Sequence, residues 1–335
     1  HCWIAPTFEQ NGTTGECLDY DLYKLAIKQA MPLGLTSIKF TGGEPLLHPQ
    51  FVQMVDHATQ NGLQSQLETN GTLISYDLAR HLKENTSMDF VSVSLDGSTA
   101  ATHEYMRNVK GCFEETRQGI HNLIKAGYSP QIIMSLFPDN VEEIQPLIHW
   151  AVDTGCSSVK FNIIQPSGRG TQMNKRERLL TIEELIRLGH WIEKDLQRDV
   201  AIPLQFCWPM AFHSIKRLHT GHGDICNIFR ILGVLSSGEL AMCGIGTQEK
   251  DLIYGRLGVD NIADVWISNT SLLKLRDLIP KHLEGICRQC IFKNRCLGSC
   301  VAQNYYSEKR LTAPFWFCNR ANKAGMFPSP RLRQC

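Results

Sequence analysis

Apolar residues along the first 164 positions follow two alternating spacings. Segments with apolar residues three and four positions apart, typical of amphipathic helices, alternate with short apolar runs that suit buried strands. The predicted helices are 20–31, 51–61, 76–83, 114–126 and 141–154, and the predicted strands are 37–41, 64–69, 89–95, 131–136 and 158–164. Five strand–helix alternations of this kind predict parallel strands joined by right-handed crossovers.

Two observations favour a barrel over a dinucleotide-binding sheet. No turn of the form G-x-G-x-x-G follows the first predicted strand, although a Rossmann-type sheet would require one there. Glycine and polar residues instead follow each strand, at the end where barrel folds build their sites. We therefore predict an α/β fold, a partial (β/α)6 TIM-type barrel, over residues 1–180.

The second half of the chain predicts a different organisation. Residues 181–198 carry apolar residues at helical spacing and begin with a capping box, in which Glu184 stands three residues after Thr181. We expect residues 181–220 to form a bridging helix and linker. Residues 221–335 are rich in cysteine, and we expect them to form a small second domain.

Seven of the thirteen cysteines lie between residues 226 and 318 of this second domain. They form the patterns C-x11-G-x4-C and C-x2-C-x5-C-x3-C, with one more beyond, and are Cys226, Cys243, Cys287, Cys290, Cys296, Cys300 and Cys318. Thiolates this close repel one another unless a cation shares their charge, so the spacing favours iron–sulfur clusters. Structural zinc and disulfides are the alternatives, although a C-x2-C pair closes too short a loop for a useful disulfide.

Polar groups follow three of the predicted strands. A glycine-rich turn at residues 42–45 combines a backbone that a ligand can approach with a carboxylate that can accept a hydrogen bond from an ammonium group. Each group alone is equally typical of a tight turn or a helix cap, but three on one rim favour a site for a polar small molecule. The candidate residues are Gly42, Gly43, Glu44, Pro45, Thr69, Asn70, Ser94 and Asp96.

The overall composition argues against a nucleic-acid-binding or membrane-spanning protein. Of 335 residues, 43% are hydrophobic and 20% charged, and the formal net charge is +1. A net charge this small does not indicate a basic surface that binds nucleic acid. No apolar run approaches the ~18 residues that span a bilayer. Cysteines at metal-type spacing argue for a reducing compartment, so we expect a cytoplasmic protein with no nucleic-acid or membrane partner.

These residues resemble the motifs of radical S-adenosylmethionine (radical SAM) enzymes that carry a C-terminal SPASM extension. Residues 41–45 are similar to the GGEP motif, which binds the amino group of S-adenosylmethionine. His1-Cys2 is similar to the end of the C-x3-C-x2-C loop that holds the radical SAM [4Fe-4S] cluster, and the seven later cysteines match the SPASM spacing. Besides the rim residues, the resemblance implies cofactor contacts at Arg107 and Gln165 and a metal ligand at Cys2.

The resemblance also implies two auxiliary iron–sulfur clusters, of the [4Fe-4S] type, with crossed ligands. Cys287, Cys290, Cys296 and Cys318 would hold the outer cluster, while Cys300 would join Cys226 and Cys243 on the inner one. The inner cluster then has three ligands. Cys207 is a candidate fourth, an ordinary buried cysteine is the alternative reading of that residue, and an open iron could bind a substrate thiolate.

The remaining expectations concern function. We expect the first barrel strand and two further radical-cluster cysteines to lie upstream of His1. By the resemblance, a 5′-deoxyadenosyl radical abstracts hydrogen from a peptide or protein side chain, and an oxidative modification follows. A thioether or C–C crosslink in a ribosomally made peptide is the first expectation, and maturation of a sulfatase or another enzyme is the second.

A different class stays open beside these, a non-catalytic Fe–S or zinc scaffold with a degenerate barrel. The expected partners of the enzyme are a peptide or protein substrate, with or without a leader peptide, and a reductant such as flavodoxin or ferredoxin.

Overall fold

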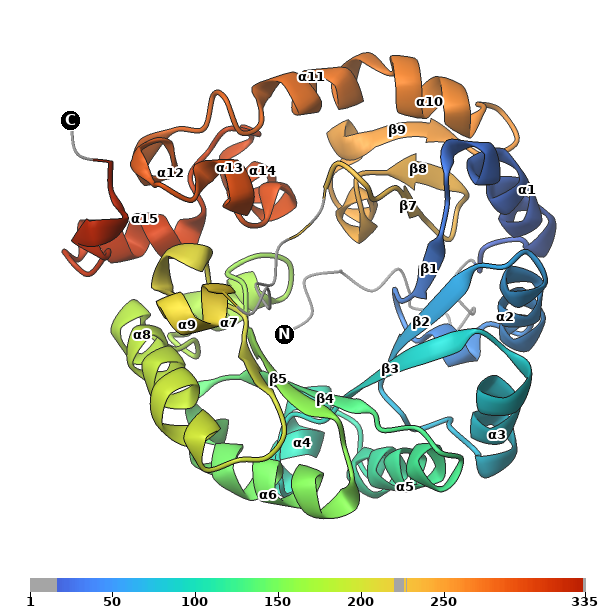
Figure 1. Cartoon of the computed structure of the whole chain (residues 1–335), viewed down its shortest axis with the longest axis horizontal. Helices are drawn as coiled ribbons and strands as arrows, with labels where there is room; N and C mark the ends of the chain where they lie inside the picture. The colour runs from blue at the N-terminus through green and yellow to red at the C-terminus, as the bar shows by residue number, and fades with distance from the viewer. Residues whose placement is uncertain (1–16, 220–225, 227, 334–335) are drawn as a thin grey trace. The chain divides into compact units, whose positions relative to one another are not determined.

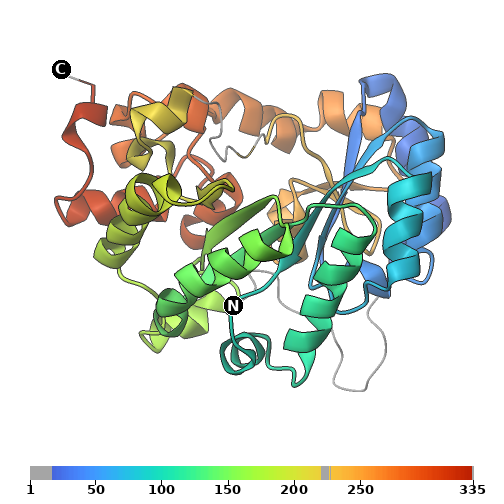
Figure 2. The same ribbon diagram turned by 60° about the horizontal axis from the view of Figure 1, so that its bottom comes forward.

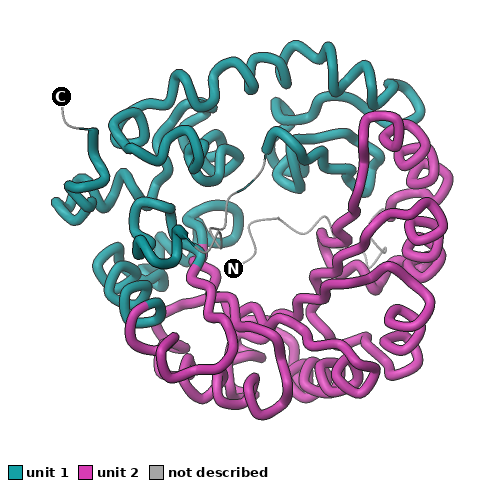
Figure 3. The backbone as a smooth tube through the Cα atoms, in the orientation of Figure 1, with its two compact units in different colours: residues 1–7, 165–193, 207–335 teal, residues 8–164, 194–206 magenta. Residues whose placement is uncertain are grey.

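The computed structural model describes residues 17–219, 226 and 228–333, and the chain divides into two compact units. Unit 1 comprises residues 1–7, 165–193 and 207–335, and unit 2 comprises residues 8–164 and 194–206 (Figure 3). Residues 181–220, which we expected to form a linker, contribute to both units. The expected domain limits therefore stay a prediction of the sequence.

Unit 2 is built on a six-stranded parallel sheet in the order β1 to β6. Its strands are β1 (Ser37–Phe40), β2 (Gln64–Thr69), β3 (Met88–Ser94), β4 (Gln131–Leu136), β5 (Ser158–Ile163) and β6 (Leu204–Phe206). Every neighbouring pair is parallel. The five predicted strands and the predicted α/β sheet are confirmed, because the apolar runs of the sequence are the strands that the sheet buries.

Helices connect these strands and lie along the outer face of the curved sheet (Figures 1 and 2). They are α1 (Tyr20–Ala30), α2 (Phe51–Gln60), α3 (Tyr76–Asn85), α4 (Ala100–Arg107), α5 (Cys112–Lys125) and α6 (Ile144–Thr154). The five predicted helices are confirmed, whereas α4 was not predicted. It begins after Thr99, whose hydroxyl accepts a hydrogen bond from the Thr102 N–H at 3.4 Å.

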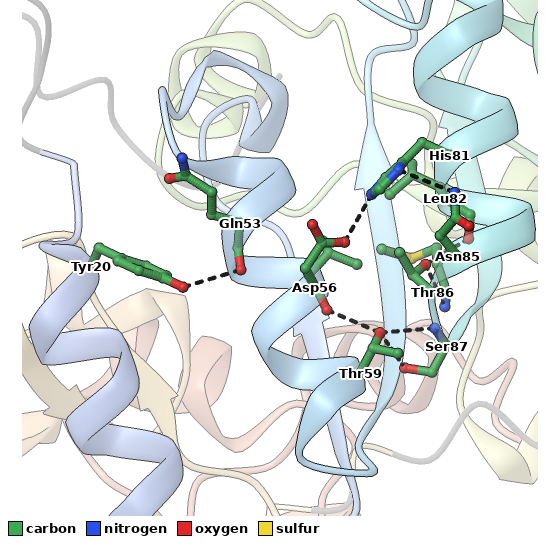
Figure 4. A network of polar contacts seen from close by, with 11 residues as sticks. Tyr20, Gln53, Asp56, Thr59, His81, Leu82, Asn85, Thr86 and Ser87 are labelled. Carbon is green, nitrogen blue, oxygen red and sulfur yellow. Dashed lines mark hydrogen bonds and ion pairs between the residues drawn. The ribbon is translucent and has the colours of Figure 1, made fainter.

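Polar contacts fasten the first three helices of this layer to one another (Figure 4). The Tyr20 hydroxyl on α1 donates to the Gln53 carbonyl on α2 at 3.3 Å, and His81 Nε2 on α3 lies 2.8 Å from Asp56 Oδ1 on α2. Thr59 Oγ1 accepts a hydrogen bond from the Ser87 N–H at 2.9 Å, just before β3. These contacts join the helices that cover the outer face of the sheet.

The strand β6 was not predicted, and it completes the sheet from a distant part of the sequence. Val159 on β5 pairs with Leu204 on β6, and Gln131 Nε2 on β4 donates to Gln205 Oε1 at 3.3 Å. The single helix predicted at 181–198 is α8 (Ile182–His190) followed by a π-helical turn and a 3₁₀ turn. The predicted capping box at its start is confirmed.

Unit 1 consists of short elements. Its antiparallel sheet contains β7 (Gly233–Val234), β8 (Glu239–Ala241) and β9 (Ile253–Arg256). Its helices besides α8 are α7 (Gly170–Lys175), α9 (Ile215–His219), α10 (Ile262–Ser268), α11 (Thr270–Leu278), α12 (Gly285–Gln289), α13 (Lys293–Cys296), α14 (Val301–Glu308) and α15 (Trp316–Lys323). Across the described residues of both units, no helix has the length and apolar character needed to cross a membrane.

Candidate functional site

The turn after β1 leaves its backbone open to a ligand. Gly42 has a φ of +128°, a conformation that residues with a side chain rarely adopt. Among the described residues, no atom lies within 4 Å of the position that a Cβ would take at Gly42 or Gly43. Pro45 then begins the short 3₁₀ helix η2 (Pro45–Leu47). A ligand can therefore approach the main-chain groups of this turn directly.

Glu44 is held in place by donors from two elements. Its Oε1 accepts a hydrogen bond from Thr69 Oγ1 at 2.6 Å, and its Oε2 accepts one from the Asn70 N–H at 2.7 Å. Burial raises the pKa of Glu44, and these hydrogen bonds offset that effect only in part. A cationic ligand group beside this carboxylate would relieve the cost of burying its charge. The geometry thus suits an ammonium group, as the sequence suggested.

Thr69 and Asn70 use their polar groups to order the rim itself. Besides its bond to Glu44, Thr69 Oγ1 accepts the Gly71 N–H at 3.0 Å. The Asn70 side-chain oxygen accepts two hydrogen bonds from Thr72, both at 2.9 Å. These residues therefore position Glu44, and the direct cofactor contact expected of them stays a prediction.

Asp96 and Arg107 form an ion pair at the end of β3. The Asp96 side chain is fully buried; its Oδ1 accepts the Ser135 N–H at 2.8 Å, and its Oδ2 lies 2.8 Å from Arg107 Nε. The side chain of Arg107, on α4, stays 23% exposed, and its charge lowers the pKa of Glu44. The buried Asp96 carboxylate thus orients Arg107, and the direct cofactor contact expected of Asp96 stays a prediction.

Three further residues were predicted to contact the cofactor or its cluster. Ser94 is the last residue of β3 and is half-buried, beside Ile133 of β4. Gln165 belongs to unit 1, where its Oε1 accepts a hydrogen bond from Trp316 Nε1 on α15. The roles expected of Ser94 and Gln165 stay predictions. Cys2 lies outside the described residues.

Four cysteines line one cavity in unit 1, and we call them the outer set. Cys287 lies in α12, Cys290 directly follows that helix, Cys296 ends α13, and Cys318 lies in α15. The cavity contains about 310 Å³ of space between atoms, part of it open to solvent, and its other walls are mostly apolar. The four residues predicted for the outer cluster are thus brought together by three short helices.

The surroundings of these four thiols suit sulfur bound to a metal centre. Burial raises the pKa of Cys287 to about 12 and that of Cys318 well above the usual value, and the neighbouring thiols raise both further. Backbone N–H groups act in the opposite direction, such as that of Phe292, which donates to Cys290 Sγ at 3.4 Å. Free thiolates are unfavourable here unless a cluster supplies positive charge, so the donor set fits an iron–sulfur cluster.

Three other cysteines form an inner set. Burial raises the pKa of Cys300 to about 12, and the neighbouring thiols of Cys226 and Cys243 contribute to that rise. Cys243 follows β8, and Gly238 makes the turn between β7 and β8 with a φ of +81°. The glycine of the C-x11-G-x4-C pattern therefore occupies a left-handed position that the hairpin needs.

A left-handed turn separates the two sets along the chain. The residues between Cys296 and Cys300 are Leu297, Gly298 and Ser299, and their φ angles are +56°, +80° and +59°. This turn sends Cys300 to the N-terminus of α14, where the Gln303 N–H donates towards its sulfur. Cys296 and Cys300 thus lie near different thiols, while the crossed ligation that the resemblance implied and the metal of each set stay predictions.

The alternative readings of the cysteines can be compared with the structure. Every cysteine among the described residues is a free thiol, so the disulfide alternative finds no support there. In the same residues, no group of three or more His, Cys, Asp or Glu side chains is close enough to hold a single metal ion. Cys207 is half-buried in unit 1, and its role as a fourth inner ligand stays a prediction.

Comparison with known proteins identifies the family. Residues 1–151 match the family model described as the radical SAM superfamily. The chain contains a radical SAM domain. Enzymes with this domain use S-adenosylmethionine and a [4Fe-4S] cluster, and those of the SPASM type carry auxiliary clusters as well. The predicted radical SAM domain and its two cofactors are therefore confirmed, while the auxiliary clusters of this chain stay a proposal.

Three known proteins show what this chain is similar to. An AdoMet-dependent heme synthase of Methanosarcina barkeri is 27% identical over 91% of the chain and 87% of its own length. The mycofactocin maturase MftC of Mycobacterium tuberculosis is 25% identical over 83% of the chain and 69% of its own length. The structure of Streptococcus suis SuiB bound to precursor peptide SuiA has a TM-score of 0.71 at 16% identity, covering 95% of this chain and 72% of SuiB. The last likeness shows that the folds agree.

Sequence reasoning missed two features of unit 1. Glu193 is buried and accepts hydrogen bonds from Trp208 Nε1, at 2.9 Å, and from His213 Nδ1, next to residues that line the outer-set cavity. Arg331 and Arg333 lie beside Cys290; burial raises the pKa of this thiol, and the charges of the two arginines offset part of that rise. A count of charges along the chain could have found the second feature, because the last 55 residues hold ten Lys and Arg but only two Glu.

Proposed function

We propose that this radical SAM protein oxidatively modifies a side chain of a peptide or protein. The observation that supports the proposal best is the gathering of seven thiols into two sets within a radical SAM protein. When bound, S-adenosylmethionine and its cluster supply a hydrogen-abstracting radical, and auxiliary clusters supply a path for a second electron. An oxidation needs both, because a substrate that has lost a hydrogen atom must lose one further electron.

The residues of unit 2 would bind and orient S-adenosylmethionine. The open backbone at Gly42 and Gly43 would accept its close approach, and the Glu44 carboxylate would take its ammonium group. Arg107, oriented by the buried Asp96, would pair with its carboxylate. Ser94 would donate to a ribose hydroxyl, and Cys2 would hold the cluster beside the cofactor.

The thiols of unit 1 would hold the auxiliary clusters. The outer set would provide four ligands and the inner set three, with Cys207 or a substrate thiolate as the fourth. The left-handed turn at residues 297–299 would direct Cys296 and Cys300 to different clusters, although only three residues separate them. The family and its relatives are enzymes, which favours catalysis over the scaffold alternative.

Within this proposal, crosslinking of a ribosomally made peptide is the first candidate. The maturase among the relatives supports a peptide substrate, as does the fold shared with a protein solved with its precursor peptide. Maturation of a sulfatase or another enzyme is the second candidate in the same class.

A tetrapyrrole is a substrate of a different class, and one observation favours it. The heme synthase relative spans more of the chain and of its own length than the maturase does. A second relative of this type, an Fe-coproporphyrin III synthase of Methanosarcina barkeri, is 29% identical over 82% of the chain. Under this reading the polar rim of unit 2 would bind the same cofactor, and only the substrate would differ.

A direct experiment separates these readings. The protein is reconstituted anaerobically with iron and sulfide and incubated with S-adenosylmethionine, a reductant and either cysteine-containing peptides or iron porphyrins. We expect 5′-deoxyadenosine to form with peptide and the peptide to lose two hydrogen atoms by mass spectrometry. New heme or Fe-coproporphyrin III without any change in the peptides would contradict the peptide proposal and support the tetrapyrrole reading.

A further inference from the structure

Positive charge is concentrated at the end of this chain. Residues 281–335 carry ten Lys and Arg and two Glu, a formal charge of +8 in a chain whose total is +1. Both glutamates, Glu284 and Glu308, pair with Arg310. Among the described residues, no carboxylate pairs with Lys293, Arg331 or Arg333. No carboxylate in the described part of the chain therefore neutralises these three charges, although Arg331 Nη2 donates to the His213 carbonyl at 3.2 Å.

Three of these cations, Lys293, Arg331 and Arg333, lie near Cys290 together with Ile291. We call the surface that these four residues form the basic face. The end of the chain runs antiparallel to the segment that contains Cys290, since the Ile291 N–H donates to the Arg331 carbonyl at 2.9 Å and the Arg333 N–H to the Gln289 carbonyl at 3.0 Å. Both arginines thus flank Cys290.

The basic face has an apolar centre. Ile291 is 45% exposed, although it stands between the buried Cys290 and the half-buried Phe292. Arg331 lies over the Phe292 ring at 5.2 Å, and both Phe292 and Lys293 line the cavity of the outer set. An exposed aliphatic residue within a ring of cations is a surface suited to a small, transient protein interface.

We propose that the basic face docks an acidic one-electron carrier protein of the flavodoxin or ferredoxin type. This inference rests on the proposed role of the outer set as cluster ligands. The oxidised carrier would take one electron from the reduced outer cluster; the cluster is oxidised by one electron, the carrier is reduced by one, and no atom changes place. Cys290 would be the ligand closest to the docked carrier, because the cations that attract the carrier flank that residue.

Charge complementarity distinguishes this occupant from others. Attraction between a patch of several cations and an acidic carrier speeds encounter and holds the complex loosely, as repeated turnover requires. An extended apolar peptide would need a groove, whereas the apolar part of the basic face is the single residue Ile291 with Phe292 beneath it. An acidic peptide would also be attracted by these cations, so it is titrated beside the two carriers.

The test measures binding, which does not depend on catalysis. Oxidised flavodoxin and oxidised ferredoxin are titrated into the reconstituted protein by calorimetry at several salt concentrations. We expect binding that weakens as salt rises, and we expect Lys293→Glu with Arg333→Glu to weaken it by about tenfold or more. Lys250→Glu with Lys274→Glu makes the same change of charge at exposed positions elsewhere in unit 1 and should leave the affinity nearly unchanged.

Milder variants and a measurement of cluster content control for other effects of the substitutions. The milder pair Lys293→Gln and Arg333→Gln should give an intermediate loss, and iron and sulfide content should equal that of the wild type in every variant. Equal carrier affinity in wild type and the double Glu variant would overturn the docking proposal, as would an acidic peptide that binds the basic face while neither carrier does. Failure of the proposed function would appear separately, as missing iron or missing 5′-deoxyadenosine.

Discussion

At the scale of single residues, the rim of unit 2 shows that polar residues after a strand can serve different purposes. Glu44 accepts hydrogen bonds from the Thr69 hydroxyl and the Asn70 N–H, so these two neighbours hold the carboxylate in position. Asp96 is fully buried and orients Arg107. Residues that look equivalent in sequence thus divide into those that can touch a ligand and those that position the others.

Replacement of Glu44 tests the ammonium site. We expect Glu44→Gln to weaken binding of S-adenosylmethionine roughly ten- to hundredfold, since a hydrogen bond between two charged groups becomes one with a neutral amide. Equilibrium dialysis measures this affinity. Glu68→Gln is the matched control, because Glu68 pairs with Lys39 on the neighbouring strands. Equal losses in both variants would count against a specific role for Glu44.

The buried His103 makes the stability of unit 2 depend on pH. Burial lowers the pKa of His103 from 6.5 to about 4, and its Nδ1 accepts the Asp96 N–H at 3.0 Å. The folded pKa lies below the unfolded one, so the stabilisation is complete above pH 6.5 and is lost as pH falls towards 4. The shift corresponds to about 3 kcal/mol.

Chemical denaturation between pH 7 and 4 measures this dependence. We expect His103→Gln to flatten the decline in unfolding free energy, while His121→Gln, at an exposed position on α5, should keep the wild-type slope. An unchanged slope in His103→Gln would show that other groups account for the decline.

At the scale of elements, the short turn between Cys296 and Cys300 decides which thiol joins which set. Three consecutive left-handed residues reverse the chain between the end of α13 and the start of α14. The spacing C-x3-C is visible in sequence, but spacing alone cannot tell a shared cluster from two separate ones. The backbone conformation of residues 297–299 makes that distinction.

Two serine variants test this division. We expect Cys296→Ser to remove the spectroscopic signal of one auxiliary cluster and Cys300→Ser to remove that of the other, because the two thiols belong to different sets. Mössbauer and EPR spectra of the reconstituted proteins record the signals, and Cys156→Ser, at a buried thiol of unit 2, should lose neither. Loss of the same signal in both cysteine variants would contradict the crossed arrangement.

At the scale of the whole molecule, the two units depend on different sources of stability. Unit 2 buries large apolar side chains around its parallel sheet, including Phe137 and Phe161, which are fully buried. Unit 1 relies on helices such as α12 and α13, which have five and four residues. Helices this short are not stable alone in water, so we expect a group bound in the cavity of the outer set to stabilise them.

Removal of the clusters should therefore affect the units unequally. After oxidation and chelation of iron, we expect backbone amides of α12, α13 and α15 to exchange hydrogen much faster. Those of β2 to β5 should keep their protection, because apolar burial holds that sheet. Hydrogen–deuterium exchange with mass spectrometry compares the two states. Equal losses in both regions, or none in α12 and α13, would contradict this division.

The fold of unit 2 could be predicted from sequence because its strands are local apolar runs, and five of them appear within a residue of their expected ends. β6 escaped prediction because its three residues become a strand only by pairing with β5. The candidate ligand residues were also visible, since both the GGEP turn and the cysteine spacing are local patterns. The burial of Asp96, the assignment of Gln165 to unit 1 and the place of Arg331 and Arg333 beside Cys290 could not be predicted in this way.

The sequence by itself determined the parallel sheet, the family and the thiol ligands available, because periodicity and short motifs are properties of neighbouring residues. Only the tertiary structure decided which carboxylate faces a ligand, which thiols share a cavity and where the final basic residues lie. Those outcomes depend on burial and on pairing between segments that are distant in the chain, such as residues 289–291 with 331–333. No local pattern records such a pairing, since its free energy arises only when both segments are folded together.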